Sequence, residues 1–95
     1  MWYTMKKRSK LRVIYDILKA IQAQDGRIKP THILYKSNLS HQMMDEYLQE
    51  LKSKDFIVEM ENGRSKTYSL TDKGHQYVER YKMIEEFTSS FGLDE

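Results

Sequence analysis

The stretch that decides the fold is THILYKSNLSHQMMDEYLQEL, residues Thr31–Leu51. Pro30, just before it, suits the first turn of a short helix, because its fixed φ is tolerated there. This helix is expected to end near Ser37-Asn38, where asparagine tolerates a left-handed backbone conformation. Ser40 then caps a second helix with its hydroxyl group. A helix, a tight turn and a second helix form a helix-turn-helix, whose second helix can lie in the major groove of DNA.

The second helix of this motif is expected to have two distinct faces. Apolar side chains at helical spacing predict a buried stripe made of Met43, Tyr47, Leu48 and Leu51. The opposite face presents polar side chains, which are His41, Gln42, Asp45, Glu46 and Gln49. His41 and Gln42 stand at the start of the helix and are the best candidates for contact with base edges, although they equally suit an ordinary exposed helix start.

A longer helix is expected before this motif, over about Ser9 to Gln24. Its apolar residues recur every three or four positions, which predicts one buried face built from Leu11, Ile14, Leu18 and Ile21. Ser9 is the predicted N-cap of this helix, and Asp25-Gly26 is the predicted stop.

A β-hairpin is expected after the helix-turn-helix. Two β-type runs, residues 57–61 and 64–70, flank Asn62-Gly63, which is a strong signal for a type I′ turn. This turn would place opposite charges and apolar side chains across from each other, which stabilises a hairpin. The predicted facing pairs are Glu61 with Arg64, Met60 with Ser65, Glu59 with Lys66, Val58 with Thr67, and Ile57 with Tyr68.

A last helix is expected to start at Thr71, which serves as its N-cap. Its apolar stripe is longer than one small domain can easily cover, and such a stripe is typical of an interface between two copies. The predicted dimerisation residues are Tyr77, Tyr81, Ile84, Phe87 and Phe91. The alternative is that this helix packs back onto the first helix and onto Trp2 and Tyr3.

The expected elements follow the order α-α-α-β-β-α, which defines an α+β, mainly helical fold. A hairpin directly after a helix-turn-helix is a wing, so we predict a winged helix-turn-helix with a C-terminal dimerisation helix. We expect a basic N-terminal arm over residues 1–8 and a winged-helix domain over residues 9–75. Residues 76–95 form the expected C-terminal helix and dimerisation element.

Three short motifs carry a resemblance to a known family. They are Thr31-x-Ile33-x-Tyr35-x-x-Asn38-Leu39-Ser40, Tyr47-Leu48-x-x-Leu51 and Tyr68-x-Leu70-Thr71-x-Lys73-Gly74. Through them, residues 8–84 resemble the small archaeal winged-helix DNA-binding proteins and are most similar to the Sulfolobus 10a type. The resemblance implies binding of duplex DNA. It also implies a homodimer in which the C-terminal helices pair as an antiparallel coiled coil.

Charge is unevenly distributed along the chain. Residues 1–40 hold nine basic and two acidic side chains, a balance of +7, whereas residues 41–95 hold seven basic and twelve acidic ones, a balance of −5. Such a basic segment suits phosphate binding, and ordinary solvated surface charge is the alternative interpretation. The predicted phosphate contacts of the arm and first helix are Lys6, Lys7, Arg8, Lys10 and Arg12. The predicted contacts beside the helix-turn-helix and on the wing are Lys29, His32, Lys36, Arg64 and Lys66.

Several classes of site are not supported by the sequence. The chain has no cysteine and its three histidines are far apart, so neither a metal site nor a cofactor is expected. It has no glycine-rich phosphate loop and no catalytic motif, so we expect neither an enzyme nor a small-molecule ligand. No apolar run suits a signal peptide or a membrane span, which favours a cytoplasmic, nucleoid-associated protein.

Two functions are compatible with these features. The first is a homodimeric DNA-binding protein, a transcription regulator or nucleoid-associated factor, which contacts duplex DNA through the second helix of the helix-turn-helix, the wing and the basic arm. That helix also carries Asp45, Glu46 and Glu50, whose carboxylates are repelled by phosphates. The alternative is therefore a protein-interaction module that uses the acidic helix to bind a basic partner.

Overall fold

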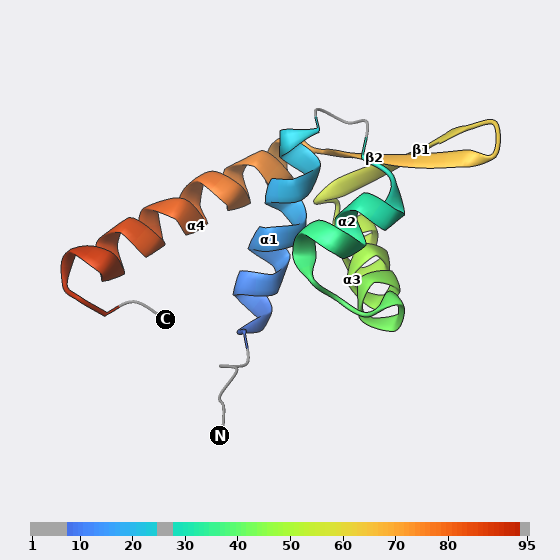
Figure 1. The fold of residues 1–95 in the computed structure, drawn as a ribbon. Helices are drawn as coiled ribbons and strands as arrows, with labels where there is room; N and C mark the ends of the chain where they lie inside the picture. The colour runs from blue at the N-terminus through green and yellow to red at the C-terminus, as the bar shows by residue number, and fades with distance from the viewer. Residues whose placement is uncertain (1–7, 25–27, 94–95) are drawn as a thin grey trace, which may run out of the picture.

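The computed structural model describes residues 8–24 and 28–93, and it confirms the predicted order of elements (Figure 1). Helix α1 (Lys10–Ala23) is followed by α2 (Pro30–Ser37) and α3 (His41–Ser53). The wing is an antiparallel hairpin of β1 (Ile57–Asn62) and β2 (Ser65–Leu70), after which the chain forms the long helix α4 (Asp72–Ser90). The fold is a mainly helical α+β winged helix-turn-helix.

Helix α1 lies at the centre of the core, because it packs against α2, α4 and β2. Ile17, Leu18 and Ile21 on its inner face are completely buried. The prediction that Leu11 is buried is wrong, since its side chain is 57% exposed. Leu11 lies in the first turn of α1, where it lines an open groove beside α4 instead of the core.

The predicted helix caps are confirmed. Side-chain oxygens of Ser9, Ser40 and Thr71 accept hydrogen bonds from backbone N–H groups in the first turns of α1, α3 and α4. These bonds satisfy donors that have no partner within the helix. Asn38, in the turn between α2 and α3, has the expected left-handed conformation with a φ of 55°. The predicted stop at Asp25-Gly26 lies outside the described residues.

Helix α3 has the two predicted faces, with one error in its buried stripe. Met44, Leu48 and Leu51 are buried, whereas Met43 is 42% exposed. The reason is helical spacing: Met44 precedes Leu48 by four residues and Leu51 by seven, which places all three on one side. Tyr47 is half-buried and packs against the edge of the core.

The wing has a different register from the predicted one. Each residue of β1 faces a residue two positions further along β2 than expected, so all of the predicted pairs are wrong. The observed pairs are Ile57 with Leu70, Val58 with Ser69, Glu59 with Tyr68, Met60 with Thr67, Glu61 with Lys66, and Asn62 with Ser65. A shift by two keeps every side chain on its expected face, because strand side chains alternate with a period of two.

The turn at the tip of the wing explains this shift. Gly63 and Arg64 form the two-residue loop, and of these two only Gly63 has a positive φ, of 67°. A positive φ at the first central residue alone matches a type II′ turn, in which glycine takes that place. The predicted type I′ turn at Asn62-Gly63 would need positive φ at both residues.

The junction between the wing and α4 is held by close contacts with the segment that follows α3. The Thr71 hydroxyl donates a hydrogen bond to the carbonyl oxygen of Asp55 at 2.6 Å. The Lys73 ammonium lies 4.5 Å from the centroid of the Phe56 ring. Gly74 lies directly against Phe56, because a Cβ atom at this position would come within 2.3 Å of the Phe56 carbonyl oxygen. The Thr-x-Lys-Gly sequence therefore fixes the direction in which α4 leaves the domain.

Candidate nucleic-acid interface

Helix α3 presents a polar face to solvent. Its exposed polar side chains include those predicted from the sequence, His41, Gln42, Asp45, Glu46 and Gln49. Gln42 donates a hydrogen bond to Glu46 at 3.5 Å. Within residues 8–24 and 28–93, Asp45 and Glu46 have no lysine or arginine in ion-pair range. The centre of this face is therefore negative.

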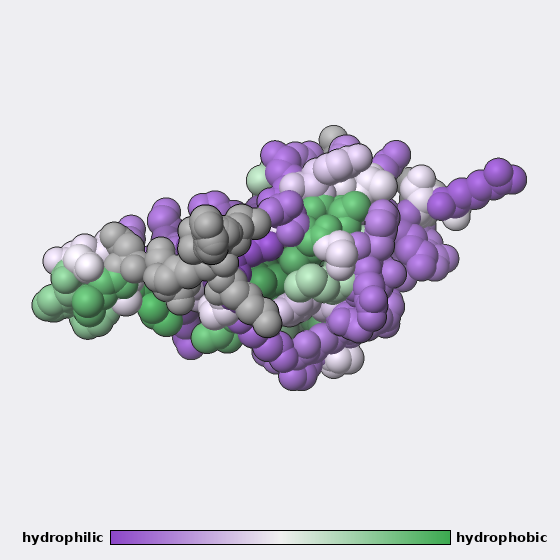
Figure 2. Space-filling view, turned by 60° about the horizontal axis from the view of Figure 1, so that its bottom comes forward, coloured by the Kyte–Doolittle hydropathy of each residue, from purple (hydrophilic) through white to green (hydrophobic). Residues whose placement is uncertain are grey.

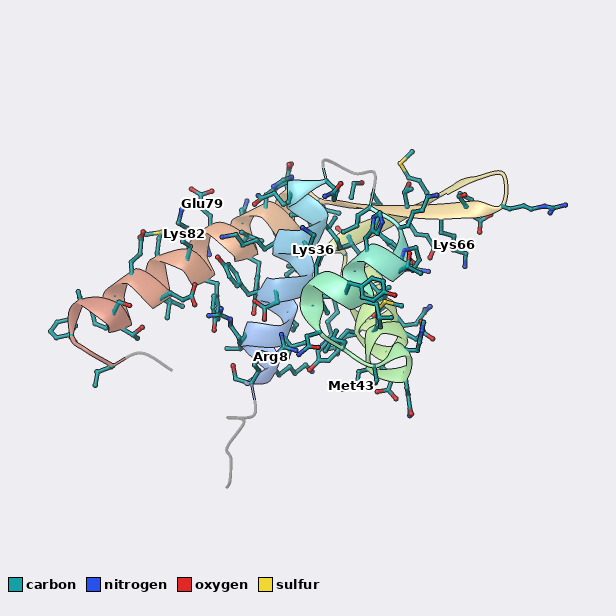
Figure 3. The ribbon with its side chains drawn as sticks, in the orientation of Figure 1. Arg8, Lys36, Met43, Lys66, Glu79 and Lys82 are labelled. Atoms are coloured by element: carbon teal, nitrogen blue, oxygen red, sulfur yellow. The ribbon has the colours of Figure 1, made fainter. Side chains whose placement is uncertain are left out.

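Helix α2 has the opposite character, since none of its residues is acidic. Four of its side chains are exposed at positions that share one side of the helix, Thr31, His32, Tyr35 and Lys36. Tyr35 is 80% exposed. Figure 3 shows Lys36 on this helix and Lys66 on the neighbouring wing. The outer side of α2 is thus polar and positive, and it exposes an aromatic ring.

A shallow, open cleft of about 340 Å³ lies between the start of α2 and the wing. We call it the α2–wing cleft, and its lining residues are Lys29, Pro30, Thr31, Arg64, Ser65 and Lys66. Three predicted DNA-binding residues thus meet here from distant parts of the chain. The hydroxyl residues Thr31 and Ser65 were not predicted, because no local pattern connects the start of a helix with the tip of a hairpin.

Two of the three cations in the α2–wing cleft are free of carboxylate partners. Among the described residues, Lys29 and Arg64 have no acidic side chain in ion-pair range. Lys66 lies 4.0 Å from Glu59 and faces Glu61 across the hairpin. The cleft is therefore positive at its rim and partly neutralised on the side of the wing.

The predicted phosphate contact Arg8 is engaged within the chain. It forms an ion pair with Asp16 at 2.6 Å. It also donates hydrogen bonds to the backbone carbonyl oxygens of Ser37 at 2.7 Å and Asn38 at 3.2 Å. Figure 3 shows Arg8 at the start of α1, close to the turn that joins α2 to α3. Arg8 therefore ties the first helix to the turn of the helix-turn-helix.

Two further predicted phosphate contacts, Lys10 and Arg12, also face carboxylates. Lys10 pairs with Glu50 of α3 at 3.0 Å. Arg12 pairs with Asp16 at 3.2 Å and with Glu85 of α4. Lys10 and Arg12 therefore do not form a free phosphate-binding surface on α1. The other two predicted contacts of the arm, Lys6 and Lys7, lie outside the described residues.

A hydrogen-bonded cluster joins the wing to α3. Glu59 Oε1 accepts a hydrogen bond from the Tyr68 hydroxyl at 2.9 Å and one from Lys52 Nζ at 3.2 Å. The bond from Tyr68 lowers the pKa of Glu59, against the opposing effect of burial, and Lys52 lowers it further. Burial and the bond to Glu59 raise the pKa of Tyr68. These contacts hold the base of the wing in a fixed position relative to α3.

The first half of α4 packs on the winged domain. Tyr81 stacks on Tyr15 of α1, with ring centroids 4.7 Å apart. The Tyr77 hydroxyl donates a hydrogen bond to the Leu11 carbonyl oxygen at 2.7 Å. Two of the five predicted dimerisation residues, Tyr77 and Tyr81, therefore contribute to packing within the chain.

The second half of α4 and the residues directly after it carry apolar side chains that are exposed within the chain. Met83, Ile84, Phe87, Phe91 and Leu93 are between 57% and 67% exposed. Figure 2 shows apolar atoms gathered over this end of the molecule. We call these five residues the apolar surface of α4. Met83 and Leu93 were not among the predicted dimerisation residues, although both are neighbours of the predicted stripe.

Two other kinds of site are absent from the described parts of the chain. No group of histidine, aspartate and glutamate side chains there is arranged to hold a metal ion. None of the helices there combines the length and apolar character that crossing a bilayer requires.

The chain belongs to the winged helix-turn-helix family, which it matches over residues 7–89. This assignment agrees with the helix-turn-helix, the hairpin wing and their order in the structure. No curated protein sequence matches the chain.

Solved structures share this fold at low sequence identity. Sso10a-2, a DNA-binding protein from Sulfolobus solfataricus, superposes with a TM-score of 0.73 at 20% identity, over 90% of each chain. AF1382 from Archaeoglobus fulgidus superposes with a TM-score of 0.71 at 18% identity, over 84% of this chain and 90% of AF1382. MepR, a transcription regulator of a Staphylococcus aureus multidrug efflux pump, superposes with a TM-score of 0.71 at 23% identity. The match covers 83% of this chain but only 61% of MepR, so this chain spans about three fifths of the length of MepR.

Proposed function

We propose that this chain binds duplex DNA and acts as a transcription regulator or nucleoid-associated factor without chemistry of its own. The observation that carries the proposal is the presentation of α3. Its apolar side is buried against the core, its polar side is exposed, and a wing that carries Arg64 and Lys66 projects beside it. A helix held in this way can enter the major groove while neighbouring elements contact the backbone.

The proposed contacts follow from this arrangement. His41 and Gln42, in the first turn of α3, reach base edges, since a glutamine amide can pair with adenine. Lys29, His32 and Lys36 flank the groove from α2, and Arg64 and Lys66 do so from the wing. The arm contributes Lys6 and Lys7, whereas Arg8, Lys10 and Arg12 contribute chiefly to holding the fold, because each already has a carboxylate partner.

Two similar structures support DNA as the partner. Sso10a-2 is a DNA-binding protein, and a MepR variant was solved bound to an oligodeoxyribonucleotide. Both share the fold of this chain, at sequence identities of 20% and 21%.

We further propose that two copies pair through the apolar surface of α4. Several large apolar side chains more than half exposed on one helix end are costly to leave in water. A second copy covers this surface with the same surface of its own, as two-fold symmetry requires. The dimer would present two winged domains to one duplex.

The DNA proposal is tested by titrating a fluorescently labelled duplex with the full chain at several salt concentrations and recording anisotropy. Binding is expected at low salt, and log K should fall linearly as log of the salt concentration rises, because bound cations release condensed counterions. Absence of binding at about 50 mM salt, or affinity that does not respond to salt, would contradict the proposal.

A second candidate function is favoured by one observation, the negative centre of α3. Asp45 and Glu46 are exposed and have no cationic partner among the described residues, so they are available to a basic protein. Replacing both by alanine separates the two functions. Affinity for DNA should rise if the chain binds DNA, because repulsion is removed, whereas a chain that captures a basic partner should bind that partner more weakly.

A further inference from the structure

We propose that the α2–wing cleft is the principal site at which this chain grips the DNA backbone, with one phosphate held between Lys29, Arg64 and Lys66. In this arrangement the duplex lies along α2 and the wing, and the acidic centre of α3 is kept away from the backbone. The inference rests on the proposed binding of duplex DNA, and it names the chemical group that is bound and the place where it is bound.

The first argument is the availability of the cations. Among the described residues, five cations already have a carboxylate within 3.2 Å, namely Arg8, Lys10, Arg12, Lys52 and Lys54. A phosphate can bind such a cation only by displacing its partner. Among the described residues, Lys29 and Arg64 have no carboxylate to displace, so a phosphate bound to them replaces only water and condensed counterions.

The second argument is the composition of the cleft. Lys29 lines the cleft from the start of α2, and Arg64 and Lys66 line it from the wing, so basic residues border the cleft on both sides. Thr31 and Ser65 line the same cleft, and their hydroxyl groups can donate hydrogen bonds. An arginine guanidinium can bind two phosphate oxygens at once, which fixes the orientation of the group as well as its place.

The third argument is the charge of the surfaces around the cleft. The exposed side of α2 continues from it and carries Lys36 but no carboxylate. The exposed side of α3 carries Asp45 and Glu46, whose charges are not neutralised by ion pairs among the described residues. A backbone laid across the centre of α3 would be repelled, whereas a backbone laid across the cleft and α2 is attracted.

This arrangement also limits what α3 can read. If the backbone is held at the α2–wing cleft, only the first turn of α3, with His41 and Gln42, needs to reach the groove. The carboxylates of Asp45 and Glu46, further along α3, then repel the DNA backbone, so α3 enters the groove only to a shallow depth.

The test maps binding on the unmodified chain by NMR, with 15N-labelled protein and a short duplex at low salt. We expect the duplex to shift the amide signals of Lys29, Thr31 and residues 64–66 more than those of residues 45–49. A second titration with inorganic phosphate, at the same ionic strength, distinguishes a site for a free anion from a site for DNA. Phosphate that shifts these signals at lower concentration than the duplex would overturn the assignment to the DNA backbone.

Two matched variants complete the test. One replaces Lys29 and Arg64 by glutamine, and the control makes the same replacement at Lys19 and Lys82, which are exposed cations on α1 and α4. The cleft variant should bind at least about tenfold more weakly at low salt, and its salt slope should fall by about one for each phosphate that the protein no longer neutralises. The control should keep the salt slope of the wild type.

The possible failures are distinguishable. If the wild-type chain binds no duplex, the proposed function fails and the inference falls with it. If the wild type binds, but the cleft variant matches the control and the duplex shifts the signals of residues 45–49 most, the chain is a DNA-binding protein and the inference about the cleft is wrong.

Discussion

Arg12 of α1 and Glu85 of α4 form an ion pair although they lie 73 positions apart in the chain. The same guanidinium contacts Asp16, and Asp16 in turn binds Arg8. Arg8 reaches the carbonyl oxygen of Ser37, next to the turn of the helix-turn-helix. One series of charged contacts therefore runs from the C-terminal helix to the element that presents α3.

Replacing Glu85 by glutamine tests this series. The side chains of Arg12 and Glu85 are 36% and 35% exposed, so solvent screens the pair and its loss should destabilise the chain by only about 0.5 kcal/mol. Urea unfolding followed by circular dichroism measures the change. Glu86→Gln on the exposed side of α4 is the control, and an equal loss in both variants would show that the pair contributes nothing of its own.

Replacing Gly74 by alanine should disturb the junction between the wing and α4. The new Cβ atom would come within 2.3 Å of the backbone carbonyl oxygen of Phe56, so the start of α4 has to move. We expect a loss of about 2–3 kcal/mol in the free energy of unfolding, as for other overpacked sites. Gly92→Ala is the control, because only open space surrounds that position and its positive φ costs about 1 kcal/mol. A Gly74 variant as stable as this control would contradict the close contact.

Stability should depend on pH through Glu59. Its pKa is lowered by the hydrogen bond from Tyr68 and by Lys52, so its ionised form stabilises the folded state. That stabilisation is present above the pKa of an unfolded glutamate, about 4.3, and is lost as the pH falls through the lower pKa of the folded state. Glu59→Gln should therefore cost on the order of 1 kcal/mol at pH 7 and progressively less below about pH 4. Urea unfolding of both proteins across this range measures the difference, which would stay constant if the carboxylate were not involved.

Replacing Phe87 by glutamate should separate the proposed dimer. Phe87 is 62% exposed within one chain, so the folded monomer tolerates the change, but a buried carboxylate at an apolar interface is unfavourable. Light scattering after size-exclusion chromatography should give about half the wild-type mass. Lys82→Glu, on a different face of α4, should leave the mass unchanged. A wild-type chain that already elutes at 11.4 kDa would rule out pairing through this surface.

The sequence predicted most of the fold because its signals are local. Ser9, Ser40 and Thr71 cap their helices through hydroxyl groups that act on the next turn, and Asn38 supplies a left-handed residue where the turn needs one. The wing was predicted in the right place with the wrong register. Glycine at position 63 permits two turn types, and the choice between them depends on backbone angles that residue identity alone does not determine.

The candidate site was less predictable, because it depends on contacts between distant segments. Arg8, Lys10 and Arg12 were predicted to contact phosphates, yet they bind carboxylates from three helices. The partners of such long side chains are set by packing, which no local spacing reveals. The α2–wing cleft could not be predicted for the same reason, since only the folded chain brings Lys29 and Arg64 to the lining of one cleft.

The last turns of α4 extend beyond the stacked rings of Tyr81 and Tyr15, away from the rest of the domain (Figure 1). In the proposed dimer, the length of this part of α4 would set the distance between the two copies of α3. One residue inserted directly before Phe87 would rotate the C-terminal end of α4 by about 100° and move it by about 1.5 Å along the helix axis. If the proposed dimer binds duplex DNA, the number of residues in α4 would therefore set the spacing between the two stretches of duplex that it contacts.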